Sequence, residues 1–517
     1  MDIAEKKRIT KTEEILWILY WIVTASSFAV FASVFILAKQ MILLLPAVAV
    51  LTLVVLLYYI SLKTGKKREK GERRFFPQIL LPILIYLGCF ISRWVYCRIM
   101  NPKTIQISDF LVVLEEAASG LFTDRLDYYR FYVHKFLYPY LLHGIGADTQ
   151  TKIYLIQSIV VSFVPVLLYF IGKNYISIRA GICAAVIYII WPVQIIYSSI
   201  VTEEHVASVL VLAIIWILIS AEMKIRSLSA TEWKSREWLK KAAVPVVLFL
   251  TAGILSGLNS FFKDWGSVIF VAVLISSIGL LIKYHSNAKR VVLILSVFLL
   301  FAGRKVTINT VDLLAEQVLG IEANNGGVVA MHMYGTLIPG APGDYNGPAN
   351  EEYRELAKQN NYDFKETNKQ AMTILKSRIA EGIDQMPDLI LRKGRMAYKD
   401  DSAVFFWVFE KELQQDTYQL LESTVNGLKK VDSVLWVFVV LAAFIAAVAI
   451  GRTKNQTVFF WLLCAVGFGM VSLLVESQGR YKYSIQPVWI LLAVYGVKVL
   501  CDFTLTVLNK NNSGEQQ

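Results

Sequence analysis

The sequence predicts an all-α polytopic membrane protein with about twelve transmembrane helices and a small extracytoplasmic, α-rich cap domain. Two observations support this fold class. Hydrophobic residues make up 56% of the 517 residues and charged residues only 18%, with a mean hydropathy of +0.52, whereas soluble domains are about a quarter charged. Long apolar runs also recur along the chain, and a bilayer core about 30 Å thick needs roughly 20 apolar residues in a helix.

Twelve apolar runs are candidate transmembrane spans. Nine precede a long polar segment and three follow it. The ninth run is short, so it either extends to about residue 310 or is a broken helix. The expected spans are residues 15–38, 41–62, 76–97, 152–171, 180–198, 205–221, 243–260, 265–282, 291–303, 433–450, 457–475 and 485–507.

The distribution of Lys and Arg sets the expected orientation. The net charge is +12, but the basic residues lie between apolar runs rather than on one soluble face, which argues against nucleic-acid binding. They concentrate at the start of the chain, in 63–74 and in 222–241, and cytoplasmic loops carry such an excess. The short opposite loops carry only Lys39, Lys263, Arg480 and Lys482. We therefore expect a multi-pass protein of the cell membrane with both termini in the cytoplasm.

This orientation divides the chain into four regions. Residues 1–75 hold two N-terminal transmembrane helices and a basic cytoplasmic loop. Residues 76–303 form a core transmembrane region whose first outer loop is 98–151. Residues 304–432 form the extracytoplasmic cap, which has helical spacing after a Gly/Pro/Asn-rich start. Residues 433–517 contain the C-terminal transmembrane helices and a cytoplasmic tail.

Four stretches place ionisable side chains at the outer ends of the expected spans, where such groups are costly unless they are used. Two stretches offer acids, and two offer cations. They are Ser108-Asp109-Phe110, Glu203-Glu204-His205, Lys263-Asp264, and the segment from Glu476 to Tyr483 that contains Arg480. In such a site a carboxylate can take a proton from an acceptor while cations neutralise an anionic leaving group.

A structural role competes with each acid. Asp109 follows a serine in a setting typical of a helix N-cap, and Glu203 and Glu204 suit the first turn of the following helix. For Asp109 we therefore weigh capping against catalysis, and for the two glutamates a helix-dipole interaction against a place in the site.

The cations and tyrosines have structural alternatives as well. Lys263 next to Asp264 can form a surface ion pair. Arg480, Tyr138 and Tyr483 are expected at headgroup depth, where Arg and Tyr anchor helices. The histidines show no spacing typical of a metal site, and metal ligands stay unknown, although a divalent cation held by carboxylate oxygens stays open.

The order of these stretches resembles the polytopic C-type glycosyltransferases, especially the bacterial relatives of protein O-mannosyltransferases and lipid A aminoarabinose transferases. Asp109, followed by Gly120 and the Tyr138-Pro139 pair, is similar to that family's first outer loop. The motifs SSIVTEE, AGILSGLNSFFKDW and ESQGRYKYSIQP resemble its later signatures. The family often has two adjacent acids in the first loop, whereas here a single acid stands between Ser108 and Phe110.

The resemblance implies a mannosyltransferase-like enzyme of the cell envelope that transfers a sugar from a polyprenyl-phosphate-linked donor, with inversion, to an extracytoplasmic glycan, lipid or protein acceptor. An aspartate would be the general base. A lipid donor needs no nucleotide-binding fold, and no GxGxxG or Walker pattern occurs in a strand–turn–helix context. The expected catalytic residues are Asp109, Glu203 and Glu204, and those expected to bind the lipid phosphate or the sugar are Lys263, Arg480, Tyr138 and Tyr483.

Two other functions stay open. A glycan polymerase or ligase also has about a dozen spans and one large outer loop, but its working residues are expected in that loop as Arg and His, and residues 304–432 contain one His. A transporter or lipid flippase places charges along a path at mid-membrane, and the centres of the expected spans are nearly free of charge.

Overall fold

The structure, a computed structural model of the whole chain, is helical almost throughout, and its described residues include no β-strand. It describes residues 3–34, 41–66, 76–100, 104–229, 235–323, 326–399, 401–411 and 415–514. The basic segment 67–75 and residues 230–234, which contribute to the expected orientation, lie outside the described residues. The protein is an all-α polytopic membrane protein, as the composition predicts.

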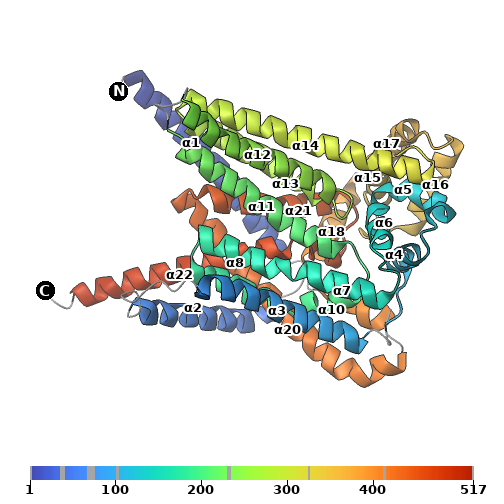
Figure 1. Cartoon of the computed structure of the whole chain (residues 1–517), viewed down its shortest axis with the longest axis horizontal. Coiled ribbons are helices and arrows are strands. Elements are labelled where there is room, and N and C mark those ends of the chain that lie inside the picture. Colours follow the sequence, from blue (N-terminus) through green and yellow to red (C-terminus); the bar gives the residue numbers. More distant parts are fainter. Residues whose placement is uncertain are drawn as a thin grey trace.

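Within the described residues, 11 helices are long and apolar enough to cross a membrane, and one bent pair raises the number to as many as 12. Both chain termini lie at one end of this bundle (Figure 1). The spanning helices are α1 (Ile3–Ala32), α2 (Leu44–Lys66), α3 (Phe76–Met100), α7 with α8 (Gln150–Val161 and Phe163–Tyr175), α11 (Glu204–Ser227), α12 (Arg236–Asn259), α13 (Trp265–Lys283), α14 (Asn287–Leu319), α20 (Gln415–Thr453), α21 (Gln456–Leu474) and α22 (Gln486–Gly514).

The bent pair occupies the span expected at 180–198. It consists of α9 (Ile178–Ile190) and α10 (Pro192–Ile196), the latter continued by the 3-10 turn η6 (Tyr197–Ser199), and the two parts meet at an angle of 62°. Proline disfavours a helical conformation in the residue before it, and Trp191 is accordingly extended, with φ −69° and ψ 119°. The chain therefore changes direction shortly before it reaches the two glutamates at the start of α11.

Helix α14 is continuous over 33 residues. The short run expected at 291–303 therefore extends well past residue 310, and the helix ends at Leu319 rather than near residue 304. Small residues let α14 approach α12 closely, since a Cβ atom on Gly253 would lie 2.2 Å from the carbonyl oxygen of Leu300. At the other boundary, α20 begins at residue 415, before the expected start of the span at 433.

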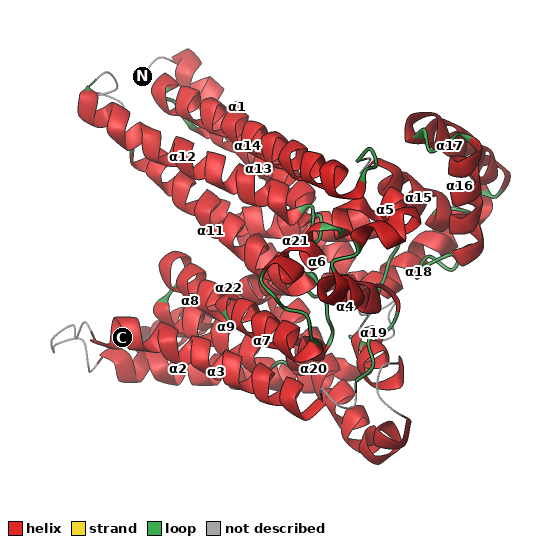
Figure 2. Cartoon of the chain, turned by 45° about the vertical axis from the view of Figure 1, so that its right-hand side comes forward, coloured by secondary structure: helices red, strands yellow, loops and turns green. Residues whose placement is uncertain are grey.

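Two sets of short helices cover the end of the bundle opposite the termini (Figures 1 and 2); we call this the cap end. The first set is α4 (Ser108–Ser119), η4 (Phe122–Arg125), α5 (Leu126–Tyr132), η5 (Val133–Lys135) and α6 (Leu137–Gly144). The second is α15 (Gly326–Thr336), α16 (Gly347–Gln359), α17 (Phe364–Glu381), η7 (Ile383–Gln385), α18 (Met386–Tyr398), α19 (Ser402–Phe405) and the π-helix η8 (Phe406–Lys411).

The two sets share a hydrophobic core. Phe131 and Tyr132 of α5 pack in one cluster with Met331 of α15 and Tyr353 of α16. Helix α15 lies within the Gly/Pro/Asn-rich stretch that precedes the predicted helical part of the cap, and its buried face explains why it is helical. The cap helices thus form a layer that sits on the ends of the spanning helices and joins the loop after α3 to the segment after α14.

Candidate active site

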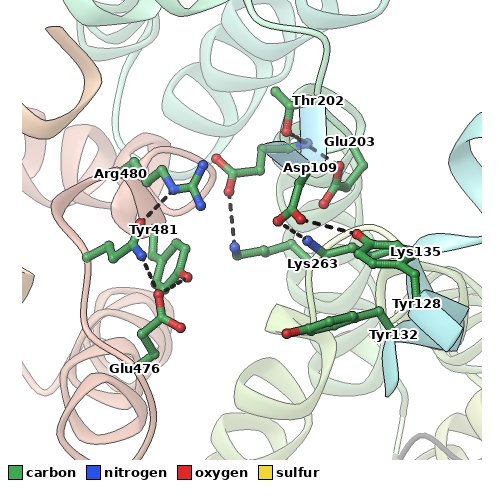
Figure 3. A network of polar contacts seen from close by, with 12 residues as sticks. Asp109, Tyr128, Tyr132, Lys135, Thr202, Glu203, Lys263, Glu476, Arg480 and Tyr481 are labelled. Atoms are coloured by element: carbon green, nitrogen blue, oxygen red, sulfur yellow. Dashed lines mark hydrogen bonds and ion pairs between the residues drawn. The ribbon is translucent and has the colours of Figure 1, made fainter. Parts of the chain in front are cut away.

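Side chains from four distant parts of the chain meet in one polar network at the cap end of the bundle (Figure 3). The four parts that hold predicted residues are α4, the start of α11 with the residue before it, the turn after α12, and the 3-10 turn η9 (Gly479–Lys482), and Lys135 of η5 and His332 of α15 join them. The network includes Asp109, Glu203, Glu204, Lys263 and Arg480, all of which the sequence had indicated.

Asp109 lies in the first turn of α4 but does not cap this helix. The N-cap residue is Ile107. Ser108 between them has φ +54°, a left-handed conformation that costs a non-glycine residue roughly 1–2 kcal/mol. One carboxylate oxygen of Asp109 accepts a hydrogen bond from Lys135 at 2.5 Å and the other accepts one from the Tyr128 hydroxyl at 3.3 Å. The capping interpretation is therefore wrong, and the side chain belongs to the network.

Lys135 controls the protonation of Asp109. Burial alone would raise the pKa of this carboxyl group, but the Lys135 ammonium, aided by Arg480 and by the hydrogen bond from Tyr128, lowers it well below its ordinary value. Asp109 is thus ionised at physiological pH. It is also a weak base for as long as Lys135 stays paired with it.

Glu204 and Lys263 form a second ion pair. Glu204 is only 3% exposed; its Oε1 accepts a hydrogen bond from Lys263 Nζ at 3.0 Å, and its Oε2 accepts one from the Tyr197 hydroxyl at 3.0 Å. The ammonium lies 3.8 Å from the centroid of the Tyr481 ring. Lys263 is therefore not paired with its neighbour Asp264, whose carboxylate instead caps α13.

The Glu203 carboxylate has weaker hydrogen-bond partners than the carboxylates of Asp109 and Glu204. The hydrogen bond that it accepts from the Thr202 hydroxyl is long, at 3.5 Å. Burial raises the pKa of Glu203, and the nearby Lys135 offsets part of this rise. Because its pKa is raised, Glu203 has, of these three acids, the carboxylate that takes up a proton most readily.

Arg480 lies among aromatic rings. Its guanidinium carbon is 5.2 Å from the ring centroid of Phe110, 5.1 Å from that of Trp407 and 5.5 Å from that of Tyr481. Its Nε donates a hydrogen bond to Gln478 at 2.8 Å, which leaves the two terminal nitrogens for other partners. Figure 3 shows the guanidinium turned toward the middle of the network, so its forked donors point to where an anionic group would sit.

Two tyrosines that the sequence indicated lie outside this network. The Tyr138 hydroxyl accepts a hydrogen bond from Gln157 at 2.9 Å, and the Tyr483 hydroxyl is 2.9 Å from Nδ1 of His205. Both rings are buried. The Tyr483 ring packs 4.5 Å from that of Tyr197, so it supports the residue that holds Glu204 rather than facing the site.

Two charged partners in the network, Lys135 and His332, were not predicted from the sequence. Lys135 had no distinguishing signal beyond being a cation in an aromatic-rich stretch. His332 of α15 places Nδ1 3.2 Å from Oε2 of Glu476, whose Oε1 accepts a hydrogen bond from Tyr481 at 2.7 Å. Although burial opposes it, these contacts lower the pKa of Glu476 to about 2. The cap thereby contributes directly to the wall of the site.

In the part of the chain that the structure describes, no group of three or more His, Cys, Asp or Glu side chains is arranged to hold a metal ion. Comparison with protein-family models finds no match for the chain, and a search of the curated proteins finds no significantly similar sequence.

Proposed function

We propose that this protein is a membrane glycosyltransferase that transfers a sugar from a polyprenyl-phosphate donor to an acceptor at the cap end of the bundle. One observation carries the proposal: carboxylates come together, where the spanning helices end, with a guanidinium that has no carboxylate partner among the described residues. Transfer from a phosphate leaving group requires both a proton acceptor and a cation.

The cations of the network have different roles in the proposed reaction. Lys135 and Lys263 are already paired with carboxylates, whereas the described residues contain no carboxylate within ion-pair distance of Arg480. We assign Arg480 to the donor phosphate, because a guanidinium binds two phosphate oxygens at once. A lipid-linked donor suits this position because its polyprenyl chain can stay in the bilayer next to the bundle while its phosphate reaches the helix ends.

The reaction we propose is a single displacement. The acceptor oxygen or nitrogen attacks the anomeric carbon from the face opposite the phosphate, and the bond between that carbon and the phosphate oxygen breaks. The electron pair leaves with polyprenyl phosphate, whose charge Arg480 stabilises, and the acceptor proton passes to a carboxylate. The product has the inverted anomeric configuration.

Asp109 is our first candidate for the base, and donor binding would activate it. The donor phosphate competes with Asp109 for the Lys135 ammonium, so the pKa of Asp109 rises when Lys135 turns to the phosphate. The base thus becomes stronger only when the donor is present. Glu203 is the second candidate because its pKa is raised without any donor.

The test uses the purified full chain in lipid nanodiscs with a panel of polyprenyl-phosphate sugars and a membrane extract as the source of acceptor. We expect release of free polyprenyl phosphate from at least one donor, together with a labelled sugar product. If every donor stays intact while a labelled lipid or sugar crosses the membrane in proteoliposomes, the chain is a transporter or flippase and the proposal fails.

A further inference from the structure

A buried ion pair includes the last residue of the turn that carries Arg480. Lys482, the last residue of η9, places Nζ 2.8 Å from Oδ1 of Asp401, and the two side chains are 0% and 1% exposed. The same ammonium donates a hydrogen bond to the carbonyl oxygen of Lys399 at 2.5 Å. This pair therefore fixes one end of the η9 turn.

A second carboxylate belongs to the same buried group. Asp432 of α20 is 1% exposed; its Oδ1 accepts hydrogen bonds from Trp191 Nε1 at 2.8 Å and from the backbone amide of Val193 at 3.2 Å. The charged groups that act on it are Asp401 and Lys482. We call the group formed by Asp401, Asp432 and Lys482 the Asp432 node. It contains two carboxylates and one ammonium, so it has a formal excess of one negative charge.

The hydrogen bonds around the node leave two buried acceptors without a donor among the described residues. Because Asp401 Oδ2 can only accept a hydrogen bond, Gln486 must donate one to it from Nε2, at a distance of 2.8 Å. The Gln486 oxygen in turn accepts a hydrogen bond from Gln194 Nε2 at 2.5 Å. This chain of contacts fixes the orientation of both amides. It leaves Oε1 of Gln194 and Oδ2 of Asp432 buried with no donor among the described residues.

We propose that the Asp432 node binds one small monovalent cation, either a sodium ion or a proton. An uncompensated charge is unfavourable at a fully buried position, and buried acceptors without donors call for an ion or a proton. Asp432 Oδ2 and Gln194 Oε1 are oxygen ligands of the kind that hard cations prefer. The neighbouring elements α10 and α22 contribute the neutral amides of Gln194 and Gln486 and no further charge.

The cation also stabilises the turn next to the candidate active site. Lys482 and Arg480 lie in the same four-residue turn, so a change in charge at Asp432 alters the electrostatic pull on Lys482 and with it the position of Arg480. This coupling rests on the function proposed above, whereas the cation site itself does not.

The experiment measures the thermal unfolding temperature, Tm, of the purified full chain in detergent. Choline chloride is replaced by sodium chloride or potassium chloride at constant ionic strength, and the pH is then varied in choline chloride. A saturable rise in Tm with sodium identifies sodium as the ligand. A rise in Tm as the pH falls that is lost in Asp432→Asn, without a sodium effect, identifies a proton at the node.

Asp432→Asn removes the excess negative charge and should lose whichever response the parent shows. Glu222→Gln is the matched control, since it removes one poorly exposed carboxylate that pairs with Arg226 on α11, and it should keep the response. If the Asn variant does not fold, Gln194→Leu removes one oxygen ligand and leaves both carboxylates in place. The proposal is overturned if the parent responds to neither cation, or if parent and variant respond equally; neither outcome bears on sugar transfer.

Discussion

Replacing Asp109 by Asn tests the proposed base directly. The amide keeps the shape of the side chain but cannot take up the acceptor proton. Loss of a positioned general base typically slows a reaction about 100- to 10,000-fold, equivalent to roughly 2.7–5.4 kcal/mol in the barrier. The structural cost is smaller, because the Lys135 and Asp109 side chains are 19% and 39% exposed and such a pair contributes about 1 kcal/mol or less.

The assay compares sugar transfer and Tm for the parent, Asp109→Asn and the control Glu115→Gln. Glu115 lies on the same helix and also forms an ion pair, with Arg125, but its side chain is 48% exposed and has no contact with the network among the described residues. We expect the Asn variant to lose transfer with nearly the parental Tm, and the control to keep both. The parental rate in the Asn variant would refute the assignment, and a loss of transfer in Glu203→Gln would then identify the base.

Three further predictions concern donor binding, pH and orientation. Arg480→Ala should weaken binding of polyprenyl phosphate about 10- to 150-fold in a titration, and Arg480→Lys should restore only part of it; unchanged binding would show that Arg480 is a membrane anchor. Burial raises the pKa of Glu116 from 4.5 to about 7, so the folded state retains a proton that the unfolded chain releases, and Tm should fall as the pH rises through this window. Glu116→Gln should reduce this fall by the equivalent of roughly 1–3 kcal/mol. Reporters fused after residue 380 should be active outside the cytoplasm and those within 224–240 inside it, and the opposite pattern would reverse the orientation.

The spans were predictable because the length of an apolar run is a local property of the sequence. The end of α14 was not, since the apolar run stops at Arg304 while the helix continues to residue 319. Beyond the apolar run, Val311, Ala315 and Leu319 are buried on one face at a spacing of four, which is the pattern of an amphipathic helix under a cap. A search for long apolar segments alone does not reveal this amphipathic pattern.

The acids and cations of the site were predictable as candidates, but their pairing was not. Lys263 stands next to Asp264 in the sequence, yet it pairs with Glu204, which is 59 positions away. Asp109 pairs with Lys135 across 26 positions because α5 and η5 fold back over α4. Such pairings depend on how the helices pack, and no local pattern encodes them.

The continuous α14 has a mechanical consequence. At 1.5 Å per residue its 33 residues extend over roughly 50 Å, about 20 Å more than a bilayer core requires. A helix adapts to a thinner or thicker bilayer by tilting, and a tilt of about 10° moves the tip of a 20 Å rigid overhang by roughly 3.5 Å. Bilayer thickness would thus be transmitted as a sideways displacement of the cap helices that pack on this overhang, since Phe122 of η4 and Tyr129 of α5 lie in one hydrophobic cluster with Ala315 and Leu319.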